Sequence, residues 1–531
     1  MIKVPGSKSI AQRALLAAAL GNKKITLHNV PHNEDLNVLI EVLKQVGIKI
    51  SQKGEILTVQ GSPWKNPKGP LNFKENATAL RLFLGAALGR KIQATFKGSA
   101  RLAERPLQPL LDAYKNLSTK NRIKLPGNWS SQFASSILFY EKASGKKINL
   151  EIEGDLVSAP YFELTKKILK EFEKSPTDFY VEADLSSACP FLLWSMLSKQ
   201  RVELEGIQKN NHQADQAVLE AFESLGATLK FSKNGLQFTP PKEMKKSWKQ
   251  IDIKNFPDGA LSLILFAPFL KESTNFRGIS HLAFKESDRL EGIKKALNNL
   301  NVSYQIKKGE LTIEPGWNPP AAKLQTQKDH RLAMNFGILS QVFPKISLDQ
   351  PQCTEKSFPD FWKVLKQNCA PIVLIGSRGT GKSTLGPALA KALKLDFIDL
   401  DEELEKENKT LSKLKNEELT WVEFRLLEEQ KLAKLLPGTR RVISTGGGTA
   451  ESEKNRKLLK EHAYVIYLDG NTDLIEEGLK TRKHQPQYPN SLRDDMKKRQ
   501  ALYAPIADHQ LWVTPWDTER FTQELLESLR A

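Results

Sequence analysis

The sequence has few cysteines, no long apolar run and no strongly basic tail. Only three of its 531 residues are cysteine, and Cys189, Cys353 and Cys369 lie far apart along the chain. That spacing excludes a disulfide framework and a zinc knuckle, and it favours a reducing compartment. No apolar stretch reaches spanning length, and the opening residues, MIKVPGSKS, do not form a signal peptide. We therefore expect a cytoplasmic protein without a membrane partner.

Positive charge is in excess along the whole chain. Lysine and arginine number 79 against 61 aspartates and glutamates, which gives a formal net charge of +18. Nucleic-acid-binding proteins also carry such a charge, usually as a cluster or tail. The scatter of these residues instead favours an enzyme of small anionic substrates, with no nucleic acid as partner. The length predicts several domains.

A polar turn followed by an apolar helix occurs six times in the first two-thirds of the chain. The turns begin at positions 5, 75, 129, 184, 257 and 329, at intervals of 54 to 73 residues. Each turn offers a helix-capping residue, and each following helix is apolar enough to be buried. Repetition of this kind predicts supersecondary units that bury their apolar faces together. Several buried helix N-termini, with Lys8, Arg13, Arg81 and Arg331 nearby, predict a site for phosphorylated anions.

A different pattern begins near residue 370. The apolar strand PIVLIG at 371–376 runs into the sequence G-x-x-x-x-G-K-S and then into the helix LGPALAKAL. This context identifies a phosphate-binding loop, in which glycine amides wrap phosphates, Lys382 reaches the terminal phosphates and Ser383 holds Mg²⁺. Strands expected at 395–401, 441–445 and 463–469 alternate with helices and predict a doubly wound parallel α/β domain. We expect two domains, 1–369 and 370–531.

The second domain carries five short motifs in order: GxxxxGKST, D-x-D at 399–401, E-F-R at 423–425, GGG at 446–448 and R-x-x-L-Y at 499–503. With these motifs it resembles shikimate kinase over essentially all of 370–531. The resemblance implies ATP and Mg²⁺ as cofactors and phosphorylation of the 3-hydroxyl of shikimate, with Lys382 and Asp401 catalytic. Asp401 would accept the hydroxyl proton.

The same resemblance implies three sets of binding residues. Mg²⁺ would be held by Ser383 and Asp399. Shikimate would contact Asp401, Arg425, Gly447, Gly448 and Arg499. The nucleotide would contact Gly376, Ser377, Arg378, Gly379, Thr380, Gly381, Lys382, Ser383, Thr384 and Arg482. The family usually has an arginine before a proline in its lid, where this chain has Gln485.

Residues 1–369 carry a series of short polar motifs. They are PGSKS with Arg13, TALR at 78–81, RLAERP at 101–106, SSQ at 130–132, SAPY at 158–161, PD at 257–258, KESDRL at 285–290, DHR at 329–331 and KSFPD at 356–360. With these motifs the region resembles 5-enolpyruvylshikimate-3-phosphate synthase (EPSP synthase). The implied fold has six repeated α/β units in two lobes, about 7–182 and 1–6 plus 183–369. Substrates would bind in the cleft between the lobes, which closes on them.

The resemblance also implies the reaction of this half, which needs no cofactor. The 5-hydroxyl of shikimate 3-phosphate adds to C2 of phosphoenolpyruvate, C3 takes a proton, and phosphate then leaves. Lys8, Asp258 and Glu286 would be catalytic, with Asp258 taking the hydroxyl proton and Glu286 delivering one to C3. Phosphoenolpyruvate would contact Lys8, Arg81, Arg101, Gln132, Arg289, Arg331 and Lys356. Shikimate 3-phosphate would contact Lys8, Ser9, Arg13, Ser130, Ser131, Gln132, Ser158, Asp258, His281 and Lys285.

Single residues among these also have purely structural interpretations. Ser130 and Ser131 have the residue type of helix caps, as does Asp399. Glu286 and Arg289 have the spacing of an exposed ion pair along a helix, which would contribute only ~0.2–0.5 kcal/mol.

Taken together, the two resemblances predict a bifunctional enzyme of the shikimate pathway that is a monomer acting on small molecules. One alternative is an active synthase whose kinase half has decayed into a regulatory nucleotide-binding module, as Gln485 would suggest. Another is a basic nucleic-acid-binding protein with P-loop ATPase activity. The presence of Asp401, Arg425 and Arg499 disfavours the first alternative. The absence of an RNA-binding aromatic motif or a basic arm disfavours the second.

Overall fold

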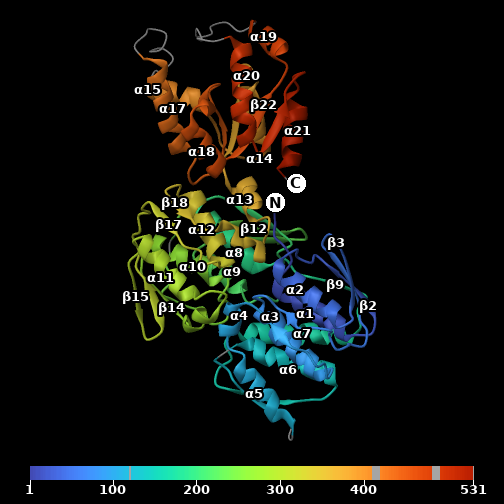
Figure 1. Cartoon of the computed structure of the whole chain (residues 1–531). Coiled ribbons are helices and arrows are strands. Elements are labelled where there is room, and N and C mark those ends of the chain that lie inside the picture. The colour runs from blue at the N-terminus through green and yellow to red at the C-terminus, as the bar shows by residue number, and fades with distance from the viewer. Residues whose placement is uncertain (119–120, 129, 245, 409–418, 481–490, 530–531) are drawn as a thin grey trace. The chain divides into compact units, whose positions relative to one another are not determined.

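The computed structural model describes residues 1–118, 121–128, 130–244, 246–408, 419–480 and 491–529 (Figure 1). Two compact units emerge from the contacts between residues. The first comprises 2–340 with 345–361, and the second comprises Met1, 341–344 and 362–531. Among the helices of the described ranges, none combines the length and the apolar character needed to cross a membrane.

The six helices predicted from the repeated turns all form in the first unit. They are α1 (Lys8–Leu20), α3 (Ala77–Gly89), α6 (Ser131–Ser144), α8 (Leu185–Ser198), α10 (Ala260–Phe266) and α12 (His330–Val342). Most of their residues are buried, because alanine, leucine and other apolar side chains occupy every face rather than one stripe. The further helices are α2 (Glu34–Gln45), α4 (Ala100–Glu104), α5 (Gln108–Lys115), α7 (Ala159–Glu173), α9 (Gln216–Ser224) and α11 (Arg289–Asn299).

Small sheets accompany these helices, three from residues before 183 and three that include later residues. The first group has the strand orders β3-β4-β2-β9, β5-β6 and β7-β8, and the second has β1-β10-β12-β11, β13-β14-β16-β15 and β17-β18. The strands of the first group are β2 (Lys24–His28), β3 (Lys49–Lys53), β4 (Ile56–Gln60), β5 (Leu71–Asn72), β6 (Phe96–Lys97), β7 (Arg122–Pro126), β8 (Asn149–Glu153) and β9 (Asp178–Tyr180). Those of the second are β1 (Ile2–Lys3), β10 (Val202–Glu205), β11 (Thr228–Ser232), β12 (Gly235–Thr239), β13 (Gln250–Asp252), β14 (Thr274–Arg277), β15 (Tyr304–Lys307), β16 (Glu310–Ile313), β17 (Ala322–Leu324) and β18 (Ile346–Leu348). The α/β fold of repeated units predicted for this half is confirmed.

The chain passes twice between the two groups of sheets, and the two passages lie side by side. The Ser7 amide donates to the Glu182 carbonyl at 2.7 Å, and the Asp184 amide donates to the Pro5 carbonyl at 2.8 Å. Strand β1 therefore pairs in parallel with β10, far along the sequence. These hydrogen bonds place the start of α1 next to the start of α8.

The second unit contains a five-stranded parallel sheet with the strand order β20-β21-β19-β22-β23. The predicted parallel sheet is confirmed, and its fifth strand, β23, was not predicted. Its strands are β19 (Ile372–Gly376), β20 (Phe397–Asp399), β21 (Val442–Ser444), β22 (Tyr464–Asp469) and β23 (His509–Trp512). Its helices include α14 (Lys382–Leu393), α15 (Leu400–Asn408), α17 (Trp421–Leu435), α18 (Glu453–His462), α19 (Thr472–Lys480), α20 (Leu492–Tyr503) and α21 (Thr518–Ser528). Alternate residues of β19 enter two separate apolar cores, which explains why this strand is apolar throughout.

Helix α13 (Phe361–Cys369) packs with the second unit although it precedes the phosphate-binding loop. Lys366 Nζ lies 2.7 Å from Asp508 Oδ2, and Arg440 Nη2 donates to the Gln367 carbonyl at 2.7 Å. The division between the units therefore falls after Phe361, the first residue of this helix, whereas the sequence pattern placed a boundary after residue 369.

Helices α3 and α6 approach closely enough for side chains on one to bond the backbone of the other. Ser136 Oγ donates to the Arg81 carbonyl at 2.6 Å. A Cβ atom on Gly85 would lie 2.0 Å from the Ser136 carbonyl oxygen. This contact needs glycine because backbone, not a movable side chain, stands in the way.

We predict that Gly85→Ala destabilises the first unit by ~1–3 kcal/mol through overpacking. Alanine would otherwise stabilise a helix interior by about 1 kcal/mol relative to glycine, so the sign of the change separates the two effects. Thermal unfolding of the full chain measures it. Gly69→Ala is the control, because a Cβ there meets no atom within 4 Å. A more stable Gly85→Ala variant would contradict the close approach.

Candidate active sites

Most residues predicted for the synthase reaction line one cavity of the first unit. The cavity is bounded by the first turns of α1, α3, α6 and α7 and by the turns before α10 and α11. The predicted residues that line it are Lys8, Ser9, Arg13, Ser130, Ser131, Gln132, Ser158, Asp258, Lys285, Glu286 and Arg289. Helix starts that are far apart in the sequence therefore meet at one cavity, where the positive ends of their dipoles favour an anion.

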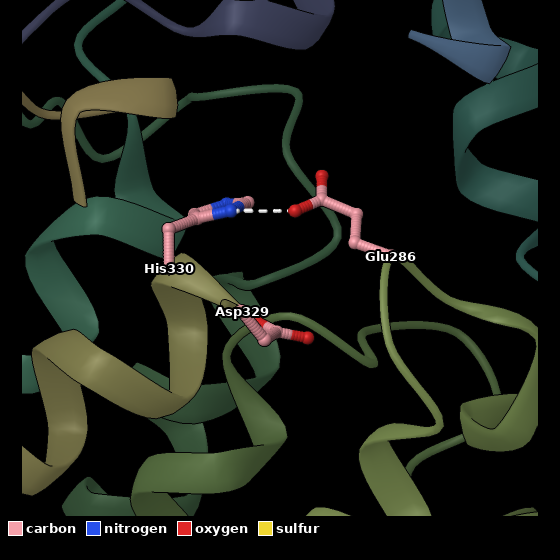
Figure 2. Close-up of side chains that lie close together, drawn as sticks. All are labelled: Glu286, Asp329 and His330. Carbon is pink, nitrogen blue, oxygen red and sulfur yellow. Dashed lines mark ion pairs between the residues drawn. The ribbon is translucent and has the colours of Figure 1, made fainter. Parts of the chain in front are cut away.

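Glu286 lies among three basic groups. Its Oε2 is 2.7 Å from His330 Nδ1 and 3.4 Å from Lys356 Nζ, and its Oε1 is 3.5 Å from Lys8 Nζ. Figure 2 shows the Glu286 carboxylate facing the His330 ring. Burial alone would raise the pKa of Glu286, but His330, Lys356 and Lys8 hold it well below its usual range. Burial lowers the pKa of His330, so at neutral pH the two lysines keep Glu286 ionised.

Asp258 lies between two arginines. Its Oδ1 is 2.8 Å from Arg289 Nη1, and its Oδ2 is 3.9 Å from Arg331 Nη2. Burial opposes ionisation, yet Arg289, Arg331 and Lys285 lower the pKa of Asp258. Arg289 is only 2% exposed and also pairs with the buried Asp329, at 3.0 Å from Nε to Oδ2. Arg289 is therefore not part of an exposed ion pair with Glu286, which was the structural interpretation of its spacing.

Three cations around the cavity have pKa values that burial lowers despite any carboxylates nearby. Burial lowers the pKa of Arg13 to about 10, of Arg81 to about 9 and of Lys285 to about 8. Arg13 donates to Thr165 Oγ1 and to the Ser9 carbonyl, both neutral acceptors, at 2.8 Å. Cations whose charge is disfavoured by burial gain most from an anionic ligand.

Arg101 was predicted to contact phosphoenolpyruvate, but Arg105 and not Arg101 lines the cavity. Arg101 does not line the cavity: its Nε donates to the Glu286 carbonyl at 3.1 Å, its Nη2 to the Lys285 carbonyl at 3.3 Å, and its Nη1 pairs with Glu104. Arg105 lines the cavity, and its buried Nε has no hydrogen-bond partner among the described residues. The motif RLAERP contains both arginines, and the sequence did not reveal which one faces the cavity.

Four other predicted residues lie beside the cavity rather than in its lining. Lys356 and Arg331 reach it through their pairs with Glu286 and Asp258. Arg81 and His281 line an adjoining cavity, where Arg81 Nη1 donates to Gln132 Oε1 at 2.7 Å. Burial lowers the pKa of His281 to about 3, so its ring is neutral.

The structure also adds residues that were not predicted. Asp35 Oδ2 lies 2.9 Å from Lys8 Nζ, and Glu75 Oε2 lies 3.0 Å from Lys356 Nζ, so each lysine has a second carboxylate partner. No motif marked either acid. Tyr161 and His330, in contrast, belong to the motifs SAPY and DHR and could have been named from them.

Glu286, Asp329 and His330 have ligand atoms close enough together to hold a metal ion (Figure 2). The surroundings argue against a cation there. Asp329 is engaged by Arg289 Nε at 3.0 Å, and Lys8 and Lys356 lie within 3.5 Å of Glu286. These positive charges favour an anion at the same place.

The phosphate-binding loop of the second unit joins β19 to α14, as predicted. Lys382 Nζ donates to the carbonyls of Gly376 and Ser377 at 2.9 Å each, so the ammonium group lies inside the loop. Ser383 Oγ donates to Asp399 Oδ2 at 2.7 Å. Asp399 Oδ1 accepts from the Asp401 amide at 3.1 Å, so Asp399 also caps α15. A hydroxyl and a carboxylate in contact are the oxygen ligands that Mg²⁺ prefers.

Asp401 is a buried carboxylate with an unusual environment. Its Oδ1 has no hydrogen-bond partner among the described residues. Burial, with smaller contributions from the carboxylates of Glu428 and Asp399, raises the pKa of Asp401 to about 6. A Cβ on Gly446 would lie 2.9 Å from Asp401 Oδ1 and 2.6 Å from Glu428 Oε1, so both acids face the glycine turn.

The glycine turn brings together the remaining predicted shikimate residues. A Cβ on Gly448 would lie 2.1 Å from Arg425 Nη2, and one on Gly447 would lie 3.4 Å from Arg499 Nη1. Arg425 Nη1 pairs with the fully buried Glu428 at 2.7 Å. Two guanidinium groups thus flank bare backbone at one edge of the sheet. Arg482 and Gln485 lie outside the described residues.

Comparison with known families covers both units. Residues 1–175 and 173–365 match the family EPSP synthase (3-phosphoshikimate 1-carboxyvinyltransferase), and residues 378–530 match the family Shikimate kinase. A 3-phosphoshikimate 1-carboxyvinyltransferase of Idiomarina loihiensis is 29% identical, over 69% of this chain and 96% of that protein. Pentafunctional AROM polypeptide 2 of Lodderomyces elongisporus is 26% identical, over 98% of this chain and 39% of that protein.

A solved structure supports the fold of the first unit. EPSP synthase from Acinetobacter baumannii aligns with a TM-score of 0.52 at 19% identity, over 69% of this chain and 96% of the other. The two family matches follow the order of the two units along the chain. They also agree with the sites described above, the cavity in the first unit and the phosphate-binding loop in the second. The chain belongs to the EPSP synthase family, and its second unit is a domain of the shikimate kinase family.

Proposed function

We propose that this chain phosphorylates shikimate with ATP and then transfers the enolpyruvyl group of phosphoenolpyruvate to the shikimate 3-phosphate formed, as a cytoplasmic bifunctional enzyme. The observation that carries the proposal is the pairing of two complementary sites in one chain. The first is a buried cluster of cations suited to two phosphorylated carboxylates, and the second is a phosphate-binding loop beside a carboxylate whose pKa is about 6.

In the first unit, substrate anions would activate the two carboxylates that move protons. Phosphoenolpyruvate brings a phosphate and a carboxylate, which would take over Lys8 and Lys356 from Glu286. Loss of those neighbours raises the pKa of Glu286 toward the range in which it can deliver a proton to C3. Competition for Arg289 and Arg331 would likewise make Asp258 a stronger base for the 5-hydroxyl.

In the second unit, Asp401 would take the proton of the shikimate 3-hydroxyl while Lys382 stabilises charge on the transferred phosphoryl group. Arg425 and Arg499 would hold the substrate against Gly447 and Gly448. Ser383 and Asp399 would hold Mg²⁺, which when bound neutralises charge on the nucleotide phosphates.

The alternative of a decayed, regulatory kinase half requires that the second unit bind nucleotide without phosphorylating shikimate. Lys382, Ser383 and Asp399 form a connected loop, and Asp401 keeps the burial of a general base. These features favour an active kinase.

Lys382→Met should abolish formation of ADP from ATP and shikimate, because the transferred phosphoryl group loses its positive partner; we expect a loss of at least about 10²–10³-fold. Conversion of added shikimate 3-phosphate and phosphoenolpyruvate to EPSP and phosphate should persist. Lys391→Met, on an exposed part of the same helix, is the control. A wild-type chain that makes no ADP but makes EPSP would establish the decayed-kinase alternative instead.

The kinase activity should depend on the ionisation of Asp401. A general base must be deprotonated, and its deprotonated fraction falls as the pH drops below its pKa of about 6. We expect kcat/KM for shikimate to fall about tenfold per pH unit below that value and to level off above it. ADP formation measured from about pH 5 to about pH 8 tests this. A flat profile over this range would rule out Asp401 as the base.

Arg105→Ala should raise KM for phosphoenolpyruvate by roughly 10- to 100-fold, as loss of a charged hydrogen bond of about 1.5–3 kcal/mol implies. Arg101→Ala is the matched variant, because that side chain binds backbone carbonyls outside the cavity, and we expect a change below about threefold. Steady-state synthase kinetics distinguish them. A larger rise in KM for phosphoenolpyruvate in Arg101→Ala than in Arg105→Ala would show that Arg101, not Arg105, contacts phosphoenolpyruvate.

A further inference from the structure

Glu451 ends the short 3₁₀ turn η5 (Thr449–Glu451) that follows the glycine triplet of the second unit. Its carboxylate bridges two basic side chains of α20. Oε1 accepts from Arg499 Nε at 2.9 Å and lies 2.8 Å from Arg499 Nη2, while Oε2 lies 2.7 Å from Lys498 Nζ. One carboxylate therefore occupies the Nε–Nη2 edge of the Arg499 guanidinium.

The remaining part of that guanidinium faces the glycine turn. A Cβ on Gly447 would lie 3.4 Å from Arg499 Nη1. On the other side of the group, Asp495 Oδ2 lies 3.2 Å from Nη2 and adds a second contact to the edge that Glu451 holds. The guanidinium is planar and its donors have a fixed fork geometry. Holding one edge consequently fixes the direction in which Nη1 points.

Glu451 is itself held in place. Arg456 Nη1 donates to the carbonyls of Ala450 and Glu451, at 3.0 and 2.6 Å. Glu451 is 25% exposed, whereas Arg499 is 8% exposed, so the contact is sheltered from competing water on the arginine side. Burial opposes ionisation of Glu451, but its hydrogen bonds to Lys498 and Arg499 lower its pKa and keep it charged.

We propose that Glu451 is a positioning residue for Arg499: it holds the Nε–Nη2 edge so that Nη1 meets the carboxylate of shikimate beside Gly447. The inference rests on the proposed kinase function and adds to it the role of Glu451, which is not among the residues predicted to contact shikimate. An aspartate or an amide at the end of η5 would alter this recognition without touching the transferred phosphoryl group.

The test uses the full chain and two substrates, shikimate and an analogue in which a hydroxymethyl group replaces the carboxylate. Glu451→Ala should raise KM for shikimate about tenfold, equivalent to about 1.4 kcal/mol, with kcat and KM for ATP unchanged. Glu451→Gln should have a smaller effect, because its amide oxygen still accepts from the guanidinium. KM for the analogue should not change in either variant. Glu453→Ala, exposed on the first turn of α18, is the control.

Two results would overturn the inference. An unchanged or lower KM for shikimate in Glu451→Ala would mean that Glu451 has no positioning role or competes with the substrate for Arg499. An equal rise in KM for both substrates would mean that Glu451 acts on the fold alone.

Arg499→Ala separates failure of this inference from failure of the proposed site. If Arg499→Ala weakens shikimate but not the analogue while Glu451→Ala does neither, only the role of Glu451 fails. If Arg499→Ala affects both substrates equally or neither, Arg499 does not read the carboxylate and the proposed shikimate site itself is wrong.

Discussion

The burial of positive charge is the constraint on which the first unit depends. Arg13, Arg289 and Arg331 are each at most 2% exposed, and guanidinium groups cannot escape burial by losing a proton at neutral pH. The fold tolerates them because carboxylates lie beside Arg289 and Arg331, and because helix starts surround the cavity that Arg13 and Arg289 line. A ligand with two or more negative groups completes this balance. Affinity for phosphorylated acids is thus a consequence of how the core is assembled.

The second unit buries negative charge at its site. There, the carboxylates of Asp401 and Glu428 face the glycine turn, and Asp401 Oδ1 has no hydrogen-bond partner among the described residues. Burial, with a smaller contribution from the neighbouring carboxylates, raises the pKa of Asp401. A carboxyl group with a pKa of about 6 is a far stronger base than a surface aspartate. The two units therefore use burial in contrasting ways, one to concentrate positive charge and one to strengthen a base.

Local patterns in the sequence predicted the elements but not all of their partners. The six helix starts and the phosphate-binding loop were predictable because each is a short segment with its own capping or glycine chemistry. Asp35 and Glu75 were not, because each meets its lysine across a long separation in sequence and carries no local signature. Arg101 and Arg105 are four positions apart in one motif, and only the end of α4 determines that they point to different places. The site-residue assignments that depend on bound substrates remain predictions.

Helix α13 and residues 341–344 group with the second unit, although both precede the phosphate-binding loop and 345–361 return to the first. Gln341 Nε2 donates to the His462 carbonyl at 3.3 Å, and Lys366 pairs with Asp508. No single cut of the chain therefore yields both units whole. A chain cut at the phosphate-binding loop would take Gln341 and Lys366 away from the second unit, and with them the contacts to His462 and Asp508.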